Sequence, residues 1–519
     1  MIDQGPVSHI RRHWAVFAGL AMGLAIWCAV DVSRRAVVDP LRPDLHMTDF
    51  TVYTVAGAAF FDGRAPYDVA NLRGWKYLYP PLFALLVAPL AWLSPPWQAT
   101  VWFVISVLLC LGSYFECRRL LASLLAKAPE LGGFAGRLGI VAGAAVLFPT
   151  LNCLQRGQIG VILLYPLLLG FRLILLGQNR GVWVCGGVVL ALPVVLKLTP
   201  LLPVVCLVLA LFIAQLGRAV ALGHELTTGF TSLFCRLGRL ASRGERAAVI
   251  DARGGALWVT AGFLGGCSLF VFIIPASMIG WNSNIVHLHT WYDRVATKVD
   301  HDRTDEFAGA GSTIRNQSLT NSVQRFGNWA ACQFAGGPDD RLVDSARPPA
   351  LGTMLMDRPV VHRLLLAARV AAGVLLLLAV AALGFGGDRL SLGFALGLAC
   401  VATLIVSPVA RGHYFLLYLP AILFGGLWIR ERRSARSAMR FAVIPMLLCL
   451  AHYLALRQAG RIGVLGIGTS LWFFAACTMV LSDALRQAKT GQPSPIEGGH
   501  FPESRESNAP SAEIARSAA

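Results

Sequence analysis

The feature that most constrains this chain is a series of apolar runs long enough to form membrane-spanning helices. A helix needs about 20 apolar residues to cross the roughly 30 Å of hydrocarbon in a bilayer. The runs lie near residues 14–32, 79–94, 97–116, 138–152, 159–177, 182–197, 198–215, 256–278, 363–385, 390–407, 413–429, 440–457 and 463–483. They lack the polar–apolar alternation of membrane-barrel strands, so the sequence predicts an all-α polytopic membrane protein.

The composition supports this fold class. Apolar residues make up 56% of the chain and charged residues 14%, whereas soluble proteins carry roughly 25% charged residues. The formal net charge of +17 would suggest a nucleic-acid partner in a soluble protein, but basic cytoplasmic loops explain it in a membrane protein. The sequence thus excludes a disordered chain, a fibre and an ordinary cytosolic enzyme, and we expect no nucleic-acid partner.

The positions of the charges predict the orientation of the helices. Segments 216–255 and 429–440 are rich in arginine and are expected to be cytoplasmic loops, whereas segment 279–361 has a nearly balanced charge and is expected outside. With both termini in the cytoplasm, the number of crossings is even. Prolines interrupt segment 79–116, so one piece there is expected to be re-entrant or interfacial, which leaves about 12 transmembrane helices.

These features indicate a single membrane-embedded domain over residues 1–487. It contains a first outer loop at 33–79, a cytoplasmic loop at 216–255 and a long outer loop at 279–361. The tail 488–519 is rich in Ser, Pro, Glu and Ala and is expected to be disordered in the cytoplasm. No CxxC or HExxH pattern occurs, so neither a metal site nor a cofactor is expected.

The first outer loop carries an acidic residue beside several aromatic residues. Residues 49–61 have apolar positions at helical spacing, which predicts a short amphipathic helix on the membrane surface that begins near Asp49. Asp49 could cap this helix or serve as a general base. Tyr53 and Tyr79 are further candidates in the same loop.

The second polar outer segment spans residues 311–329. Asn316, Gln317 and Arg325 supply amide and guanidinium donors that suit hydroxyl or phosphate groups. An ordinary solvated loop would explain the same polarity.

Polar residues also interrupt the apolar runs at three turns on the predicted outer side. These turns carry Gln158 after Arg156, Lys197, and Arg411 with His413. Ionisable residues at membrane depth usually face a cavity or a partner, although lysine and arginine can also snorkel to the interface. Since five polar segments converge on one face, we expect an outer cavity with one carboxylate and several cations.

Such a cavity suits the transfer of a group from a lipid phosphate. The positive-inside rule does not account for three of the outward cations, Lys197, Arg325 and Arg411. They could bind the phosphate of a lipid-linked donor, while Asp49 accepts a proton from an attacking hydroxyl.

These motifs, taken in order, resemble glycosyltransferase family 87, the polyprenol-phosphate-mannose-dependent mannosyltransferases of the GT-C membrane fold. The resemblance covers roughly residues 14–430. It is carried by Asp49-Phe50-x-x-Tyr53, Gly63-x-x-x-Tyr67-Asp68, Tyr79-Pro80-Pro81-Leu82-Phe83, Ala88-Pro89-Leu90, Gly157-Gln158, Lys197-Leu198-Thr199-Pro200, Asn316-Gln317-Ser318-Leu319 with Arg325, and Ser407-Pro408 with His413-Tyr414. Two positions depart from the family pattern and each adds an arginine: Arg156, where members often have Asn, and Arg411, in a stretch that often holds an aromatic residue.

The resemblance implies a glycosyltransferase in a bacterial inner or plasma membrane that moves a hexose, mannose above all, from a polyprenyl-phosphate-linked donor to a lipid or glycan acceptor. Asp49 would act as general base, the reaction would invert the anomeric carbon, and the bound partners would be the donor, the acceptor and membrane lipids. The outward cations and His413 would stabilise the leaving phosphate without a metal ion. Two alternatives are a transporter or flippase of a lipid-linked sugar, and a ligase that uses a diphosphate lipid.

Overall fold

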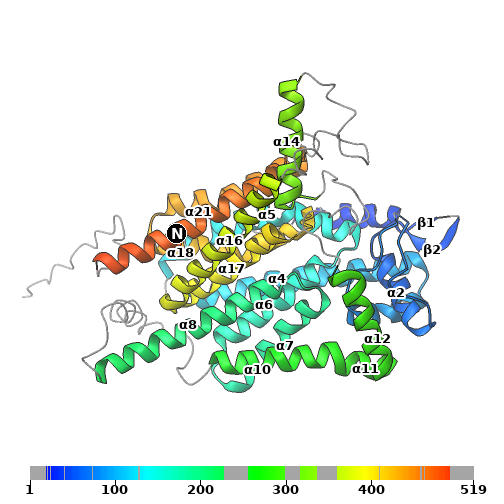
Figure 1. Cartoon of the computed structure of the whole chain (residues 1–519), viewed down its shortest axis with the longest axis horizontal. Coiled ribbons are helices and arrows are strands. Elements are labelled where there is room, and N and C mark those ends of the chain that lie inside the picture. Colours follow the sequence, from blue (N-terminus) through cyan, green and yellow to red (C-terminus); the bar gives the residue numbers. More distant parts are fainter. Residues whose placement is uncertain are drawn as a thin grey trace, which may run out of the picture.

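The computed structural model shows a bundle of helices that run along one long axis (Figure 1). It describes residues 19, 22–23, 25–39, 41–72, 74–126, 129–226, 255–297, 316–335, 359–407, 409–455, 459–460 and 462–490. Within these ranges, eight helices are long and apolar enough to cross a membrane. The chain is therefore an all-α polytopic membrane protein, with one small hairpin besides its helices.

The first half of the chain contains the hairpin and the helices up to α8. Their bounds are β1 Val38–Asp39, β2 Arg42–His46, α2 Thr51–Phe61, α3 Pro81–Val87, η1 Ala88–Trp92, α4 Pro95–Leu125, η2 Pro129–Leu131, α5 Gly132–Arg156, α6 Gly160–Leu176, α7 Arg180–Leu196 and α8 Leu201–Leu226.

The second half continues the bundle. Its elements are α10 Gly255–Ser268, η4 Leu269–Ile273, α11 Ile274–Ile279, α12 Trp281–Trp291, η5 Tyr292–Ala296, α14 Leu319–Ala335, α16 Pro359–Gly386, α17 Arg389–Val406, η6 Gly412–Leu417, α18 Tyr418–Arg432, α19 Ala435–Leu454 and α21 Val464–Thr490.

Helix α17 lies at the centre of the bundle. All its residues from Leu390 to Ile405 are buried, and two glycines let α18 approach it closely. A Cβ at Gly397 would lie 2.5 Å from Ala421 Cα, and one at Gly393 would lie 2.5 Å from the Phe424 ring. A helix this apolar on all sides belongs in the protein interior. Helix α17 is therefore the central helix of the bundle and connects its two ends.

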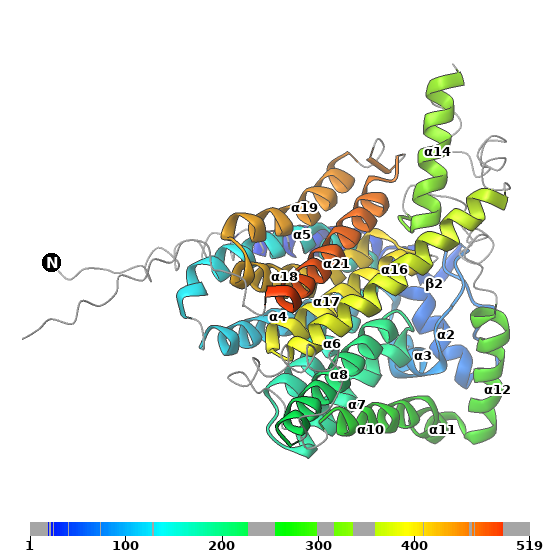
Figure 2. The same cartoon turned by 60° about the vertical axis from the view of Figure 1, so that its left-hand side comes forward.

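Helix α10 packs along α7 at the edge of the bundle (Figure 2). The contact is close because a Cβ at Gly187 would lie 2.2 Å from the Val259 carbonyl oxygen, and one at Gly262 would lie 2.2 Å from that of Val184. Such stripes of small residues are how membrane helices bring their backbones together.

The structure clarifies the proline-interrupted segment 79–116. Residues Pro81–Trp92 form a short helical piece, α3 followed by η1, whereas Pro95–Leu125 is one continuous helix of 31 residues. A 12-residue helix is only about 18 Å long, so this segment supplies one crossing instead of two. The count of about 12 crossings includes the shorter apolar helices α6, α7 and α8 and the run 14–32, part of which lies outside the described residues, and it stays a prediction.

Several predicted loops differ from the structure in detail. The expected outer loop 279–361 contains α12, η5 and α14. Helix α14 projects from the bundle (Figures 1 and 2). Helix α8 extends to Leu226, and most of the predicted loop 216–255 beyond it lies outside the described residues. Helix α21 extends to Thr490, and the rest of the predicted tail also lies outside them.

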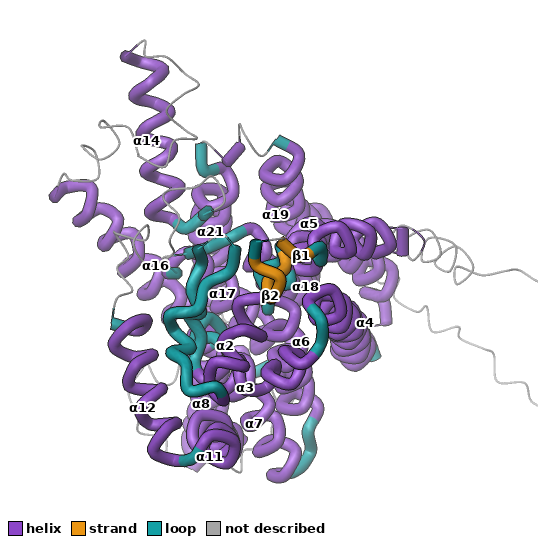
Figure 3. Tube along the Cα trace, turned by 90° about the vertical axis from the view of Figure 1, so that its right-hand side faces the viewer, coloured by secondary structure: helices purple, strands orange, loops and turns teal. Residues whose placement is uncertain are grey.

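The prediction of an amphipathic surface helix in the first outer loop is wrong. Helix α2 is buried around most of its circumference, from Thr51 and Val52 to Ala59 and Phe60. It packs against α3, η1 and α4, at the end of the bundle where the hairpin also lies (Figure 3). Both faces of the helix carry apolar residues, and protein covers each of them.

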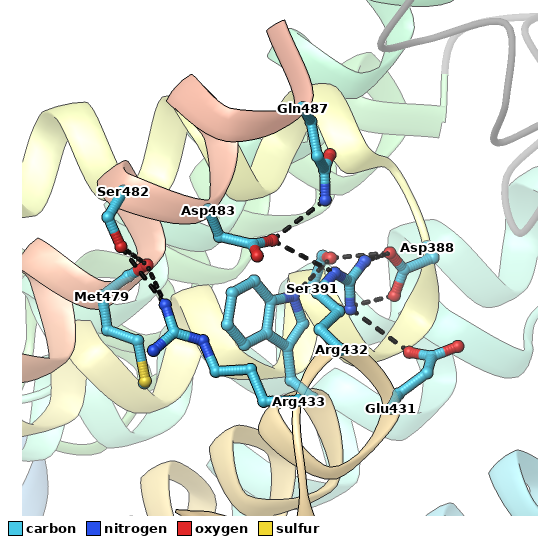
Figure 4. A network of polar contacts seen from close by, with 10 residues as sticks. Asp388, Ser391, Glu431, Arg432, Arg433, Met479, Ser482, Asp483 and Gln487 are labelled. Atoms are coloured by element: carbon cyan, nitrogen blue, oxygen red, sulfur yellow. Dashed lines mark hydrogen bonds and ion pairs between the residues drawn. The ribbon is translucent and has the colours of Figure 1, made fainter. Parts of the chain in front are cut away.

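The opposite end of the bundle holds a network of ion pairs that joins α17, α18 and α21 (Figure 4). The Arg432 guanidinium lies 3.1 Å from Asp388 Oδ2, 3.2 Å from Glu431 Oε2 and 3.8 Å from Asp483 Oδ2. It also lies 4.6 Å from the centre of the Trp428 ring. Each carboxylate thus shares the charge of one arginine, which stabilises the junction of three helices.

Asp388 also caps α17. Its carboxylate accepts hydrogen bonds from the Ser391 backbone N–H at 2.8 Å and from the Ser391 hydroxyl at 2.6 Å. The Ser391 hydroxyl in turn accepts a bond from Trp428 Nε1 at 3.2 Å. This cap satisfies a backbone donor at the helix start and joins it to the ion-pair network.

Candidate active site

The site begins at the turn between α5 and α6, residues 156–159. Gly157 ends α5 with φ +65°, and a Cβ there would lie 2.8 Å from Phe50 Cβ. A left-handed glycine costs no strain at such a position. Because the position has no side chain, this turn packs directly on Phe50, which stacks on Trp102 at 4.2 Å.

The turn brings Gln158 to Asp49. The Gln158 side-chain amide donates to Asp49 Oδ2 at 2.6 Å, and the Asn71 amide donates to Oδ1 at 3.3 Å. Arg156 Nη1 lies 3.8 Å from the same carboxylate, and its carbonyl accepts from the Asp49 backbone N–H at 2.9 Å. Asp49 is 3% exposed, so amide donors and a guanidinium stabilise a buried negative charge.

The capping alternative for Asp49 is not what the structure shows. The N-cap residue of α2 is Phe50, without a side-chain cap hydrogen bond, and the Asp49 carboxylate instead receives the side chains of Gln158 and Asn71. Its position, one residue before the cap, leaves the carboxylate directed toward the turn between α5 and α6.

Buried His46 and Tyr53 lie on either side of Asp49 in the sequence. His46 Nδ1 and the Thr48 hydroxyl are 2.8 Å apart, and burial lowers the pKa of His46 to about 4. Burial, with smaller contributions from Tyr79 and Asp49, raises the pKa of Tyr53 well above its ordinary value. Both side chains are therefore neutral at pH 7, and Tyr53 shares a 3.3 Å hydroxyl contact with Tyr79.

Lys197 lies in an aromatic setting at the end of α7. Its ammonium donates to the Tyr414 hydroxyl and lies 3.9 Å from the centre of the Tyr414 ring and 5.4 Å from that of Tyr79. Aromatic faces attract cations without neutralising their charge. Neighbouring rings hold the charged end of this lysine, and the snorkelling alternative stays an untested prediction.

Arg411 lies over Trp75, with its Cζ 4.0 Å from the ring centre. Its backbone pairs with Asn316 in an isolated antiparallel bridge. Asn316 Oδ1 also accepts from the Ala410 N–H at 3.0 Å, and the Gln317 N–H donates to the Ala410 carbonyl at 2.6 Å. The predicted polar segment near residue 316 therefore fixes the backbone that carries Arg411.

The alternative of a solvated loop around residues 316–325 is wrong for its described part. Asn316, Gln317 and Arg325 are each less than a tenth exposed. Arg325 lies in α14 and interacts electrostatically with His452 of α19; burial lowers its pKa to about 9, which leaves it charged at pH 7.

His413 lies among the cations of the cluster. It is 2% exposed and packs edge-on against the Tyr414 ring, with centres 4.5 Å apart. It interacts electrostatically with Lys197, Arg411 and Arg156. Residues from the first outer segment, the two turns after α5 and α7, and η6 thus form one cluster.

Sequence reasoning missed two members of this cluster, Asn71 and Trp75. Asn71 contacts the carboxylate and Trp75 supports Arg411. The signal was the stretch Asn71-x-x-Gly74-Trp75, where Asn and Gly favour a turn and an exposed tryptophan would be unusual. Arg156 was noted in its polar turn and as a departure from a family pattern but was not a predicted site residue, and it faces Asp49.

The chemistry of the cluster follows from its charges. Among the described residues named above, one carboxylate is accompanied by the cations of Arg156, Lys197 and Arg411. A base that accepts a proton and cations that bind an anionic leaving group are the components of group transfer from a phosphate. Within the described ranges, no group of three His, Cys, Asp or Glu residues is arranged to hold a metal ion.

Comparison with known proteins gave one match. Residues 77–235 match a family model described as Glycosyltransferase family 87. No curated protein and no solved structure matches the chain. The matched segment includes Tyr79, Gln158 and Lys197, whereas Asp49 and Arg411 lie outside it, so the contacts described above join the matched segment to the rest of the cluster.

Proposed function

We propose that this chain, a member of glycosyltransferase family 87 and therefore a multi-pass membrane glycosyltransferase, transfers a hexose from a polyprenyl-phosphate-linked donor to an acceptor hydroxyl. The transfer takes place on the extracytoplasmic face. The donor sugar that we favour is mannose, and the acceptor is a membrane lipid or a glycan. The observation that carries the proposal is the 2.6 Å hydrogen bond from Gln158, inside the family match, to the buried carboxylate of Asp49 outside it.

In the proposed reaction the Asp49 carboxylate takes the proton of the acceptor hydroxyl. The acceptor oxygen forms a bond to the anomeric carbon from the side opposite the phosphate, so the configuration inverts. The bond between that carbon and the phosphate oxygen breaks, and its electron pair leaves with the lipid phosphate. Asp49 thus ends protonated, and the polyprenyl phosphate gains the negative charge.

The cations assist by binding the leaving phosphate. Lys197 and Arg411 supply positive charge beside Tyr79 and Trp75, and His413 lies among them. Such preorganised charge stabilises the phosphate as the bond breaks. Gln158 orients the Asp49 carboxylate. This raises the fraction of encounters between acceptor and donor that have the geometry for in-line attack.

The test is a transfer assay with purified enzyme, radiolabelled polyprenyl-phosphate mannose and lipid extracted from the native membrane. We expect a product heavier than its acceptor by one hexose, formed by the wild-type protein and lost in Asp49→Asn. A parallel assay with a polyprenyl-diphosphate donor separates the ligase alternative. Donor uptake into vesicles without a covalent product would refute the transferase mechanism, as would full activity of Asp49→Asn.

A further inference from the structure

A short turn in the first outer segment touches both the base and a donor-binding cation. The turn is closed by an antiparallel bridge between Ala70 and Lys76. Within it, the Asn71 N–H donates to the Trp75 carbonyl, and the Trp75 N–H donates to Asn71 Oδ1, both at 3.0 Å. Gly74, with φ +76°, donates to the Asn71 carbonyl at 2.9 Å. Asn71 therefore holds the turn through its backbone and through its side-chain oxygen.

The other half of the same side chain reaches Asp49. While Asn71 Oδ1 accepts from Trp75, the Asn71 amide nitrogen donates to Asp49 Oδ1 at 3.3 Å. Gln158 holds the second oxygen of Asp49. The two carboxylate oxygens are thus held by different parts of the chain, and both Asn71 and Asp49 are less than a twentieth exposed.

Trp75 continues the connection to the phosphate side of the site. Its ring lies under Arg411 at 4.0 Å, while its backbone is bonded to Asn71. The Arg411 backbone is held separately by Asn316. Trp75 therefore determines the position of the Arg411 guanidinium and not the path of the Arg411 backbone. A continuous path of contacts leads from Asp49 through Asn71 and Trp75 to Arg411.

We propose that Asn71 and Trp75 are positioning residues that set the separation between the general base and the phosphate-binding guanidinium. This proposal rests on the proposed function. Inverting transfer needs the base on one side of the anomeric carbon and the phosphate charge on the other, so the base–cation spacing must match the substrate. A displacement of about 1 Å can cost roughly 100-fold in rate, and one hydrogen-bonded turn that touches both groups holds that spacing.

The experiment measures kcat and donor KM for four variants with polyprenyl-phosphate mannose. Asn71→Ala removes both functions of the side chain, whereas Asn71→Asp keeps the oxygen that accepts from Trp75, loses the donor to Asp49 and adds a second negative charge beside it. We expect both to lower kcat about 10- to 100-fold with donor KM within about twofold of wild type. Trp75→Leu should raise donor KM about fivefold with a smaller change in kcat, and Trp75→Phe should stay within about twofold of wild type, because it keeps an aromatic face.

The Asp variant separates positioning from folding. If Asn71 only closed the turn, Asn71→Asp would be as active as wild type, and that result would overturn the proposal. So would an unchanged donor KM in Trp75→Leu. Thermal unfolding in detergent is followed for every variant, and Trp75→Leu carries the test if the Asn71 variants do not fold.

Asp49→Asn in the same series tells the two proposals apart. If Asp49→Asn is inactive while Asn71→Asp is normal, only the positioning role fails. If Asp49→Asn is fully active, the proposed function fails with it.

Discussion

The two ends of helix α17 carry charged groups arranged in opposite ways. At its start, the Arg432 guanidinium is shared among Asp388, Glu431 and Asp483. Beyond its end, Asp49 is accompanied by Arg156 and by cations that lie on aromatic rings. An 18-residue helix separates the two regions by roughly 27 Å. In the first arrangement one guanidinium joins three carboxylates of the protein, whereas in the second the cations outnumber the carboxylate, which fits the proposed binding of an anionic donor.

The largest expected effect comes from removing the carboxylate of the outer cluster. Asp49→Asn should lower kcat by about 10³-fold, because general base catalysis contributes roughly 10²- to 10⁴-fold, while the thermal midpoint in detergent stays near that of wild type. Asp62→Asn is the matched control, since Asp62 is an exposed residue of the same segment paired with Arg64. A large loss of stability in Asp49→Asn would instead indicate that this carboxylate supports the structure, as the network around Arg432 does.

Arg432→Met should have the next largest effect, and on stability. Removing the shared cation leaves partly buried carboxylates without their main partner, which we expect to cost about 2–3 kcal/mol of unfolding free energy. The thermal midpoint should fall, but the folded fraction should retain its donor KM. Arg436→Met, at an exposed position of α19, serves as the control. A changed donor KM would show that the two ends are coupled.

Lys197→Met tests whether the outer cations serve a ligand. Loss of one charge-assisted contact should raise donor KM roughly 10- to 30-fold, and the thermal midpoint should not fall, because no carboxylate loses its partner. Lys489→Met, at an exposed position near the other end of the bundle, should change neither quantity. Unchanged donor KM in Lys197→Met would remove this lysine from the phosphate site.

The smallest effect concerns acid stability at the outer end. The pKa of His46 is lowered from 6.5 to about 4 in the folded protein, so the unfolded chain binds the proton more readily between those values. Stability is therefore complete above about pH 6.5 and falls as the pH drops toward 4, by about 1–2 kcal/mol near pH 5. His46→Gln, which can still bond to Thr48, should show a weaker dependence of its thermal midpoint on pH between 7 and 5. An identical dependence in both proteins would argue against this contribution.

Much of this site could be predicted from local patterns. Lys197 and Gln158 interrupt apolar runs, and such interruptions are costly at membrane depth, so each could be recognised without a structure. The hydrogen bond between Gln158 and Asp49 could not, because it joins residues 109 positions apart through the close approach that Gly157 allows. The amphipathic interpretation of α2 was wrong because periodicity does not say what covers the second face of a helix.

The ion-pair network around Arg432 could not be predicted from the sequence, for a related reason. Arg432 belongs to an arginine-rich segment that the positive-inside rule already explains, so nothing local indicated ion pairs with Asp388 and Asp483. Asn71 and Trp75 were overlooked because a turn of polar residues ordinarily lies in water. In both cases the partners come from distant parts of the chain.

The short helices around the site have a consequence for the surrounding lipid. Helices α6 and α7 have 17 residues each and α17 has 18, or roughly 26–27 Å, a few ångströms less than the hydrocarbon thickness of a typical bilayer. Gln158 precedes α6, Lys197 follows α7 and Arg411 follows α17. The cations at these helix ends therefore lie within the depth of the surrounding lipid, and the proposed lipid-linked donor would meet them there with its phosphate while its hydrocarbon chain stays in the bilayer.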